Sequence, residues 1–213
     1  TYNTGVSGNR MVWFKNYGTG YGIISDSVNF DGQYIPTGGD IKSAQSNGIT
    51  FNSDSFSDGG LLGAASTDHA FFFTLAETAE VFDIVSYTGD VSSSHVIPHN
   101  LGVEPGMIII KNPNSNGMNW VVWHKDLDAT QGLHLNSHTA QQYISAKVTA
   151  VSSENFTVNA DGNANDSGAD FIAYVFGADT AGKVKCGTYE GNSGYQLINV
   201  GFQPGFVLIK NID

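Results

Sequence analysis

Two pairs of histidines have a spacing that can bind a metal ion. His95 and His99 are four residues apart, and so are His134 and His138. On a helix this spacing places two imidazoles on one face, where they could hold zinc. Neither segment has a helical pattern, and the Glu of the zinc-protease motif is missing from both. We therefore expect these histidines to lie in solvated loops.

A third group of reactive residues consists of His124, Asp126 and Asp128. Nucleophilic catalysis would need an activated nucleophile beside such a base, and the chain has no Gly-x-Ser-x-Gly elbow. A polysaccharide depolymerase would instead need an exposed pair of carboxylates at hydrolase spacing. We predict no catalytic residues and a protein that is not an enzyme, with the depolymerase left open as an alternative.

The loop that follows residue 158 is rich in oxygen ligands. Asn159, Asp161, Asn163, Asn165 and Asp166 lie there with two glycines. Calcium prefers several such oxygens in a flexible loop, but an EF-hand would also need a Glu at its twelfth position. The loop is therefore a candidate calcium site through Asn159, Asp161, Asn163 and Asp166, with a set of Asx turns as the alternative. No other cofactor is predicted.

Aromatic side chains offer a possible ligand surface. Sugar rings could stack on Trp120, Trp123 and Tyr143, and also on Tyr174. Trp120 and Trp123 have opposite parity on a strand, so they point to opposite faces and one of them belongs to the core. Ligand binding by Trp120, Trp123 and Tyr143 is the alternative function: a carbohydrate-binding adhesin module that recognises a host-surface glycan.

A repeated six-residue pattern shows which elements position these residues. An apolar run closed by Lys-Asn occurs at 11–16, 107–112 and 206–211, in steps of 96 and 99 residues. A fixed period of this size indicates a repeat array, and we expect the chain to be part of a longer one. The predicted units are 1–79, which lacks its opening segment, 80–178, which is complete, and 179–213, which has only the opening.

The complete unit predicts about seven short strands. Six of them are 107–110, 119–124, 132–136, the hairpin 146–151 with 155–159, and 170–176. In the first unit we align 21–24 with 120–123, 48–51 and 53–56 with the hairpin, and 71–75 with 171–175. In the third, Tyr189-Glu190-Gly191 matches Tyr87-Thr88-Gly89. Residues 139–145 are the best helix candidate in a chain with little helical periodicity.

Residues shared between the copies have structural interpretations. Pro105 and Pro204 precede an apolar run without alternation, which predicts a strand buried on both faces. The Lys-Asn pair after that run is expected where the strand meets solvent, with Asn in a left-handed turn. Cys186, the single cysteine, is expected to be buried and to have no chemical role.

Composition supports the same fold class and excludes some partners. Glycine is abundant at 26 of 213 residues, only 14% of residues are charged, and β-branched and aromatic residues are plentiful. The prediction is an all-β protein of tandem β-sandwich, jelly-roll-like repeats. Net charge is −11 with nine scattered basic residues, so we expect neither nucleic-acid binding nor membrane insertion.

The order of these motifs resembles a known repeat. The chain resembles a β-rich repeat of large virion and tail-fibre-like proteins of marine tailed bacteriophages. The motifs that carry the resemblance are Tyr-x-Gly at 87–89, Asn-Leu-Gly-x-x-Pro at 100–105, the strand ending in Lys-Asn, the Trp-containing strand, Phe-Thr-Val at 156–158 and Tyr-Val-Phe at 174–176. The resemblance implies a structural virion protein that takes part in assembly or host attachment. Its implied partners are other virion proteins and further copies of itself, with a trimer favoured, and it implies no catalytic residues.

Overall fold

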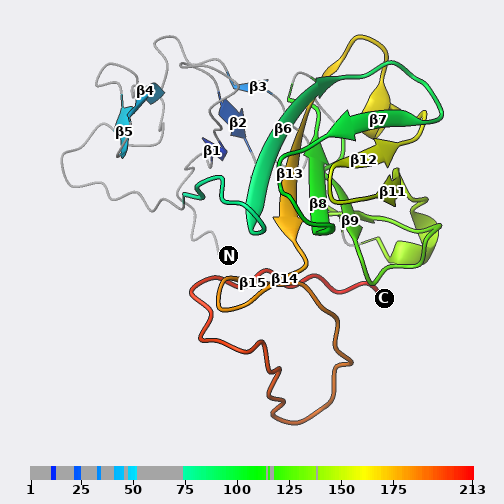
Figure 1. The fold of residues 1–213 in the computed structure, drawn as a ribbon. Coiled ribbons are helices and arrows are strands. Elements are labelled where there is room, and N and C mark those ends of the chain that lie inside the picture. The colour runs from blue at the N-terminus through cyan, green and yellow to red at the C-terminus, as the bar shows by residue number, and fades with distance from the viewer. Residues whose placement is uncertain are drawn as a thin grey trace, which may run out of the picture. The chain divides into compact units, whose positions relative to one another are not determined.

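The computed structural model describes residues 74–113, 115, 118–137 and 139–213, and five strands before them. The chain divides into two compact units, one of residues 1–74 with 113–117 and one of residues 75–112 with 118–213. Each unit is described by itself. The coloured ribbon of Figure 1 follows both from the N-terminus to the C-terminus.

The described part of the first unit consists of short antiparallel strands. A three-stranded sheet has the order β1-β2-β3, and β4 pairs with β5 as a hairpin. Their bounds are β1 Met11–Val12, β2 Gly22–Ile24, β3 Gln33–Tyr34, β4 Ile41–Gln45 and β5 Gly48–Phe51.

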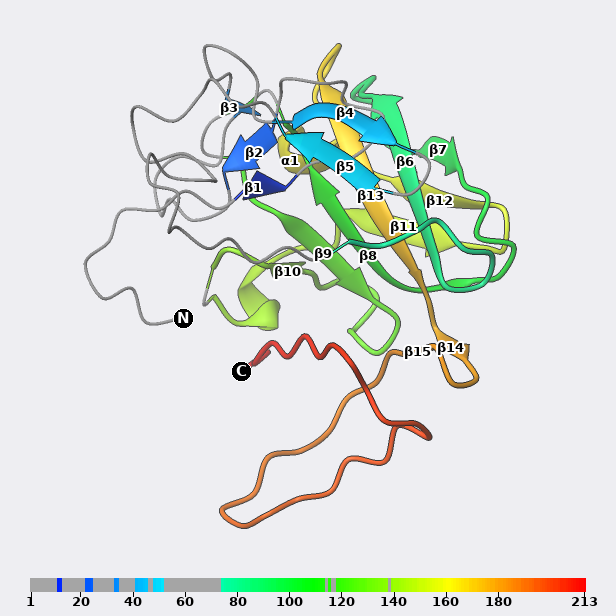
Figure 2. The ribbon, with the colours of Figure 1, turned by 90° about the vertical axis from the view of Figure 1, so that its left-hand side faces the viewer.

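The second unit contains a five-stranded antiparallel sheet of order β10-β9-β8-β13-β6 (Figures 1 and 2). Its strands are rich in Val, Ile, Phe and Tyr, which suit a pleated and half-buried surface. Their bounds are β6 Phe82–Thr88, β8 Pro105–Lys111, β9 Val121–His124, β10 Leu133–His134 and β13 Asp170–Gly177.

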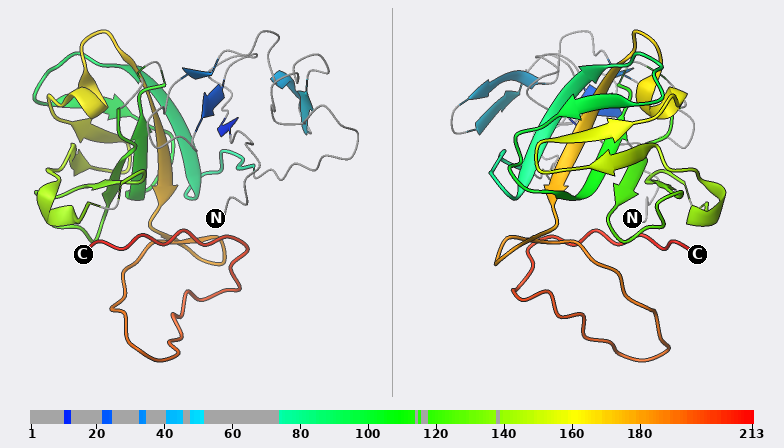
Figure 3. Two further views of the ribbon diagram at one scale, coloured as in Figure 1. Left: turned by 180° about the vertical axis from the view of Figure 1, so that it is seen from behind. Right: turned by 45° about the vertical axis from the view of Figure 1, so that its right-hand side comes forward.

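A three-stranded antiparallel sheet of order β11-β12-β7 forms the second layer, and Figure 3 shows the ribbon from two further sides. Its strands are β7 His95–Pro98, β11 Val148–Val151 and β12 Asn155–Val158. The remaining elements are the 3-10 helix η2 Gln141–Tyr143, the four-residue helix α1 Gly162–Asn165 and the hairpin of β14 Asp179–Thr180 with β15 Val184–Lys185.

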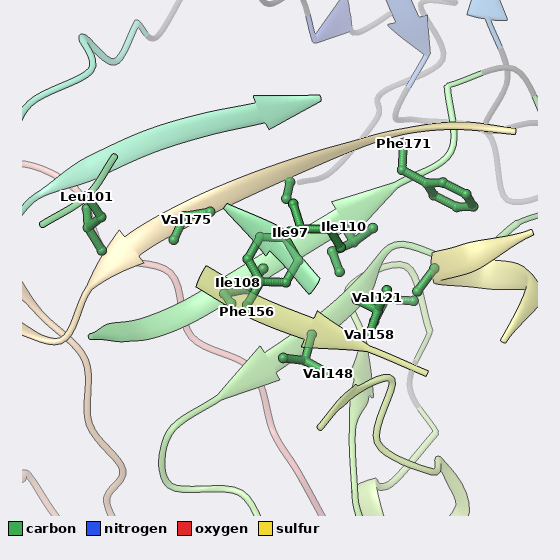
Figure 4. Close-up of a cluster of buried hydrophobic side chains, with 12 residues drawn as sticks. Ile97, Leu101, Ile108, Ile110, Val121, Val148, Phe156, Val158, Phe171 and Val175 are labelled. Carbon is green, nitrogen blue, oxygen red and sulfur yellow. The ribbon is translucent and has the colours of Figure 1, made fainter. Parts of the chain in front are cut away.

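The two sheets of the second unit enclose one apolar core (Figure 4). β8 and β13 contribute alternate residues from one sheet, and Ile97, Val148 and Phe156 come from the other. Phe156 is fully buried, and burial of such a side chain is worth about 1.5–3 kcal/mol. The full cluster is Ile97, Leu101, Ile108, Ile110, Val121, Val148, Phe156, Val158, Ala164, Phe171, Ala173 and Val175.

The all-β prediction is confirmed, since antiparallel strands dominate the described residues. The predicted hairpin of 146–151 with 155–159 is present as β11 and β12, with three residues between them. The run 107–110 is buried on both faces, but its strand begins at Pro105 rather than after it. A proline within a sheet usually needs an edge strand or a bulge. Pro105 is accommodated in the central strand β8 because it pairs with Gly177, where the register of β8 and β13 shifts.

Three local predictions need correction. Gly48–Phe51 forms the second strand of its hairpin rather than the first, while residues 53–56 lie outside the described part of the chain. The Asx loop contains α1, because Asp161 caps the helix by accepting a hydrogen bond from the Asn163 amide. The helix candidate 139–145 shortens to η2, whose N-cap lacks a side-chain hydrogen bond.

The last 27 residues differ from the rest of their unit. Residues 187–213, all of which the structure describes, form neither helix nor strand. Figures 1 and 2 show this stretch as an open loop coloured from orange to red. Near its end, Lys210 Nζ donates to the Ser137 carbonyl at 2.7 Å and the Gln141 amide donates to the Ile212 carbonyl at 3.0 Å.

Candidate functional site

The three aromatic residues proposed for sugar binding do not share one exposed surface. Trp120 is only 7% exposed and stacks on Tyr174, with ring centroids 6.3 Å apart and planes 20° from parallel. Trp123 packs against the apolar core. Tyr143, on η2, is 77% exposed. The alternation of a strand thus places the two tryptophans on opposite faces, and only Tyr143 has a ring open to a ligand.

The Lys-Asn pair is buried rather than solvated, so this prediction is wrong for the complete unit. Lys111 is fully buried and Asn112 is 2% exposed. Lys111 Nζ donates to the Met118 carbonyl at 2.7 Å and lies 5.8 Å from the centroid of the Trp120 ring. Asn112 also has no positive φ. The lysine therefore links the end of β8 to the start of the Trp-containing strand through a charged hydrogen bond and a cation–π contact.

The Asx loop uses its oxygens within the protein. Asp161 Oδ2 accepts from Lys147 Nζ at 2.6 Å, and its Oδ1 accepts from the amide and side chain of Asn163. Burial alone would raise the pKa of Asp161, but these hydrogen bonds and the Lys147 charge outweigh it and lower the pKa. In this structure the cationic partner of the Asp161 carboxylate is the Lys147 ammonium.

The other calcium candidates serve similar local roles. Asn163 Oδ1 accepts from the Asn119 amide at 3.1 Å, and Asp166 Oδ1 accepts from the Ser167 amide at 3.1 Å. Asn159 Nδ2 donates to the Ala146 carbonyl at 2.8 Å. Among the described residues no group of three or more His, Cys, Asp or Glu side chains could hold a metal ion. The loop is a set of Asx contacts and a helix cap.

The histidines of the second unit that the structure describes act one at a time. His99 is buried in the loop after β7, and its Nε2 lies 3.1 Å from the Ser152 carbonyl while its Nδ1 accepts from the Leu101 amide. His95 contacts Asn165 instead. Because β7 is a strand, the spacing of four residues separates these rings rather than bringing them together. His138 lies outside the described residues.

His124 and Cys186 are also held in structural contacts. His124 Nδ1 accepts from the Asp126 amide at 3.3 Å, and desolvation lowers its pKa despite the nearby carboxylate. Cys186 is buried as predicted, its Sγ lies 3.4 Å from the Gly177 carbonyl, and burial raises its pKa to about 11. A thiol with so high a pKa is a poor nucleophile at neutral pH.

Asn165, at the end of α1, is a polar side chain with four hydrogen-bond contacts. It is fully buried, and its Oδ1 accepts from the Asp90 amide and lies 2.9 Å from His95 Nδ1. Its Nδ2 donates to Asp90 Oδ1 at 3.1 Å and to the Ser92 carbonyl at 3.0 Å. One amide thus joins α1 to the loop after β6 and to β7, which belong to different sheets.

The Tyr-x-Gly motif belongs to the same junction. The Tyr87 hydroxyl donates to the Ala164 carbonyl at 2.6 Å, and its ring stacks on Phe171 with centroids 5.3 Å apart. Gly89 lies so close to α1 that an added Cβ would be 2.1 Å from the Asp166 carbonyl oxygen. The motif therefore fixes the chain after β6 against α1, and we name Tyr87, Gly89 and Asn165 the α1 junction.

The α1 junction was only partly visible in the sequence. Recurrence of Tyr-x-Gly in the third copy indicated that Tyr87 and Gly89 serve the unit. Asn165 was grouped with the calcium loop, because nothing in a single sequence shows that its side chain turns toward residues 70 to 75 positions earlier.

Comparison with known proteins gives one match. A family model described as a domain of unknown function (DUF7483) matches residues 22–213, which is most of the chain. Comparisons with curated proteins and with solved structures give no match. Within the described residues, none of the helices has the length and apolar character needed to span a bilayer.

Proposed function

This chain belongs to the DUF7483 family, and we propose that it is a non-enzymatic structural protein of tandem β-sandwich repeats in a tailed-bacteriophage virion, such as a tail fibre. The repeat architecture is supported by strand registers in the described residues. Assignment to a virion is supported by the sequence resemblance. In this role each unit spaces or presents its neighbours, and units meet through repeated interfaces.

The observation that carries the repeat architecture is the similar antiparallel pairing of strands in the two units. β1 pairs with β2 so that Met11 faces Ile24, and β8 pairs with β9 so that Met107 faces His124. In both units the strand of the Lys-Asn pattern thus pairs antiparallel with the strand that follows it. This register aligns Ile24 with His124, one position away from the sequence alignment, which matched Ile24 to Trp123.

The hairpins of the two units share an irregularity as well as a register. In β4–β5, Ile41 faces Phe51 and the register shifts before Ser43. In β11–β12, Val148 faces Val158 and the register shifts before Ala150. A bulge at the same place in both hairpins supports a common unit, because bulges are specific features of a fold. The pairing aligns Ile49-Thr50-Phe51 with Phe156-Thr157-Val158.

A structural role also fits the use of the polar residues. His95, His99, the Asx loop and Lys111 make contacts that hold one segment of the second unit to another. Catalytic residues are instead usually directed toward a substrate from a concave site. We therefore assign the polar residues of the second unit to folding rather than to turnover.

The test of the virion assignment is the presence of the protein in purified particles. Tailed phage that encode this chain would be purified on a density gradient, analysed by mass spectrometry and labelled with antibody against residues 75–186. We expect the protein in intact particles and label at a defined position on the tail or surface. Detection in the infected-cell lysate together with absence from intact particles would contradict the assignment.

Oligomerisation is part of the same proposal, with a trimer favoured because trimers bury the apolar surfaces of adjacent units. Sedimentation equilibrium should give three times the 22.7 kDa of one chain. A mass of one chain at micromolar concentration would contradict it.

Glycan recognition stays as the alternative function through the exposed Tyr143. Stacking of one aromatic ring on a sugar would be lost in a Tyr143→Ala variant. A glycan array probed with the native chain and with this variant separates the two functions. Binding that disappears in the variant, with an unchanged melting temperature, would favour the adhesin.

A further inference from the structure

Residues 187–213 repeat the opening of the complete unit but leave its apolar side chains exposed. We name this stretch the opening segment. Val207 and Ile209 are 61% and 64% exposed, whereas their equivalents Ile108 and Ile110 are fully buried. The other exposed large apolar side chains of the segment are Tyr189, Tyr195, Leu197, Ile198, Phe206 and Leu208. A soluble chain rarely exposes so many adjacent apolar side chains unless they bind a partner.

The complete unit shows what covers an apolar run of this kind. β8 lies in the middle of its sheet, where Ile108 faces Trp123 of β9 on one side and Val175 of β13 on the other. Phe156 and Val158 of the second sheet close the core over it. The equivalent run at 206–209 has the sequence of a central strand, yet it pairs with no strand in the part of the chain that the structure describes.

The Tyr-x-Gly motif of the opening segment is likewise without its contact. In the complete unit, Tyr87 donates to α1 and Gly89 lies against it. Tyr189 is 48% exposed, and an added Cβ at Gly191 would meet nothing within 4 Å. A glycine with open space around it is expected where a second surface approaches the backbone as closely as α1 approaches Gly89.

The turn before the apolar run is already formed in the opening segment. Gly201 has φ +83°, and Gly102, its equivalent, has φ +80°. Each is followed three residues later by a proline, Pro204 or Pro105. A left-handed glycine before a fixed proline directs the following strand. The segment thus has the local turn geometry of the complete unit but forms no strand.

Charge leaves little role for ionic recognition. The charged residues of the opening segment are Glu190, Lys210 and Asp213. Recognition must therefore come from backbone hydrogen bonds and apolar side chains, as in the addition of β-strands.

We propose that the opening segment binds a polypeptide with the pattern of residues 115–180. That partner supplies a Trp-containing strand of the β9 type, a closing strand of the β13 type and an Asx loop of the α1 type. The closing strand would lie between 187–191 and 206–210, as β13 lies between β6 and β8. This inference rests on the repeat architecture of the proposed function and does not depend on the location in a virion.

The test supplies the partner directly. A copy of residues 115–186 is attached after Asp213 of the full chain, and hydrogen exchange is followed in peptides from 187–213, whose sequence occurs once in the product. In the unextended chain these amides should exchange at nearly the rate of an unfolded peptide. In the extended chain we expect exchange at 206–210 to slow by about 1,000-fold or more, as in a folded core strand.

Two variants of the extended chain make the result specific. Val207→Asp with Ile209→Asp places charges at the core positions of the central strand, and should return exchange to the unextended rate. Gln203→Glu is the matched control, because Glu104 occupies the equivalent exposed position in the complete unit, and should keep the protection. Peptides from 75–112 report whether the original unit stays folded in every variant.

Unchanged rapid exchange at 206–210 in the extended chain, with 75–112 still protected, would overturn the inference. Concentration-dependent protection in the unextended chain would also overturn it, because the segment would then be covered by an intact second copy, whose β13 is already paired with β6 and β8, and not by an unpaired closing strand. Absence of the protein from virions would refute the virion part of the proposed function and leave this result intact. Failure of the extended chain to protect the segment would refute this inference and leave the virion assignment intact.

Discussion

Replacing Asn165 with alanine should destabilise the second unit by about 3 kcal/mol. The side chain is fully buried and makes four hydrogen bonds. Three of them, to the Asp90 amide, to His95 and to the Ser92 carbonyl, each contribute about 1 kcal/mol net. The fourth joins the exposed carboxylate of Asp90 and is counted as zero. The estimate therefore rests on the α1 junction alone.

Urea unfolding measured by tryptophan fluorescence tests this value. A Trp13→Phe background leaves Trp120 and Trp123, both in the second unit, as reporters. With an m-value of about 1–3 kcal/mol/M, the midpoint should fall by about 1–3 M. Asn100→Ala is the matched control, because it makes the same chemical change at an exposed position. It should change the free energy of unfolding by less than about 0.5 kcal/mol.

A second variant separates hydrogen bonding from shape. Asn165→Asp keeps the size of the side chain but replaces the donor to Ser92 and Asp90 with a carboxylate oxygen, so it should destabilise at least as much as alanine at pH 7. If Asn165→Ala shifted the midpoint no more than Asn100→Ala, the α1 junction would not hold the two sheets together and the reasoning would fail.

The remaining predictions concern a close contact and two titrating groups. Gly89→Ala should lower stability by about 1–3 kcal/mol in thermal melts, because its Cβ would lie 2.1 Å from a backbone oxygen, whereas Gly187→Ala, with nothing within 4 Å, should not. Asp161 has a lowered pKa in the fold, so its contribution to the free energy of unfolding is present at neutral pH and is lost as pH falls below about 4. Asp161→Asn should therefore flatten the acid limb of a stability–pH curve. An unaltered limb would show that the ion pair contributes nothing. Burial lowers the pKa of His134, so protonation favours the unfolded chain and stability should decline as pH falls from about 7 to 5. His134→Gln should reduce that decline, and denaturant midpoints measured across this pH range would test it.

Short-range patterns accounted for much of the second unit. The alternation and turn residues of 146–159 predicted the β11–β12 hairpin, and the apolar run 107–110 predicted a strand buried on both faces. These features depend on neighbours a few residues apart, so composition and spacing are sufficient to find them. The order of the strands in each sheet is a long-range property, and the pattern of one sequence does not contain it.

The departures from local expectation come from side-chain contacts with other segments. Lys111 was expected in solvent because lysine at a strand end is usually exposed, but Met118 and Trp120 provide it with a carbonyl and an aromatic face. Asp161 was predicted as a candidate cation ligand because its loop is rich in oxygen ligands, and the structure shows that Lys147, from another segment, pairs with it. In both cases the deciding partner comes from a different segment.

The sequence by itself determined the β-rich class, the recurrence of the Lys-Asn pattern and the repeated Tyr-x-Gly and Gly-x-x-Pro motifs, because each is a local arrangement of residue types. Tertiary structure decided what those motifs do. It showed that Tyr87 and Gly89 meet α1, that Lys111 is buried, and that the same motifs at 187–213 lack the strands that would bury them. The reason is that a motif encodes one side of a contact, and only the fold supplies the other.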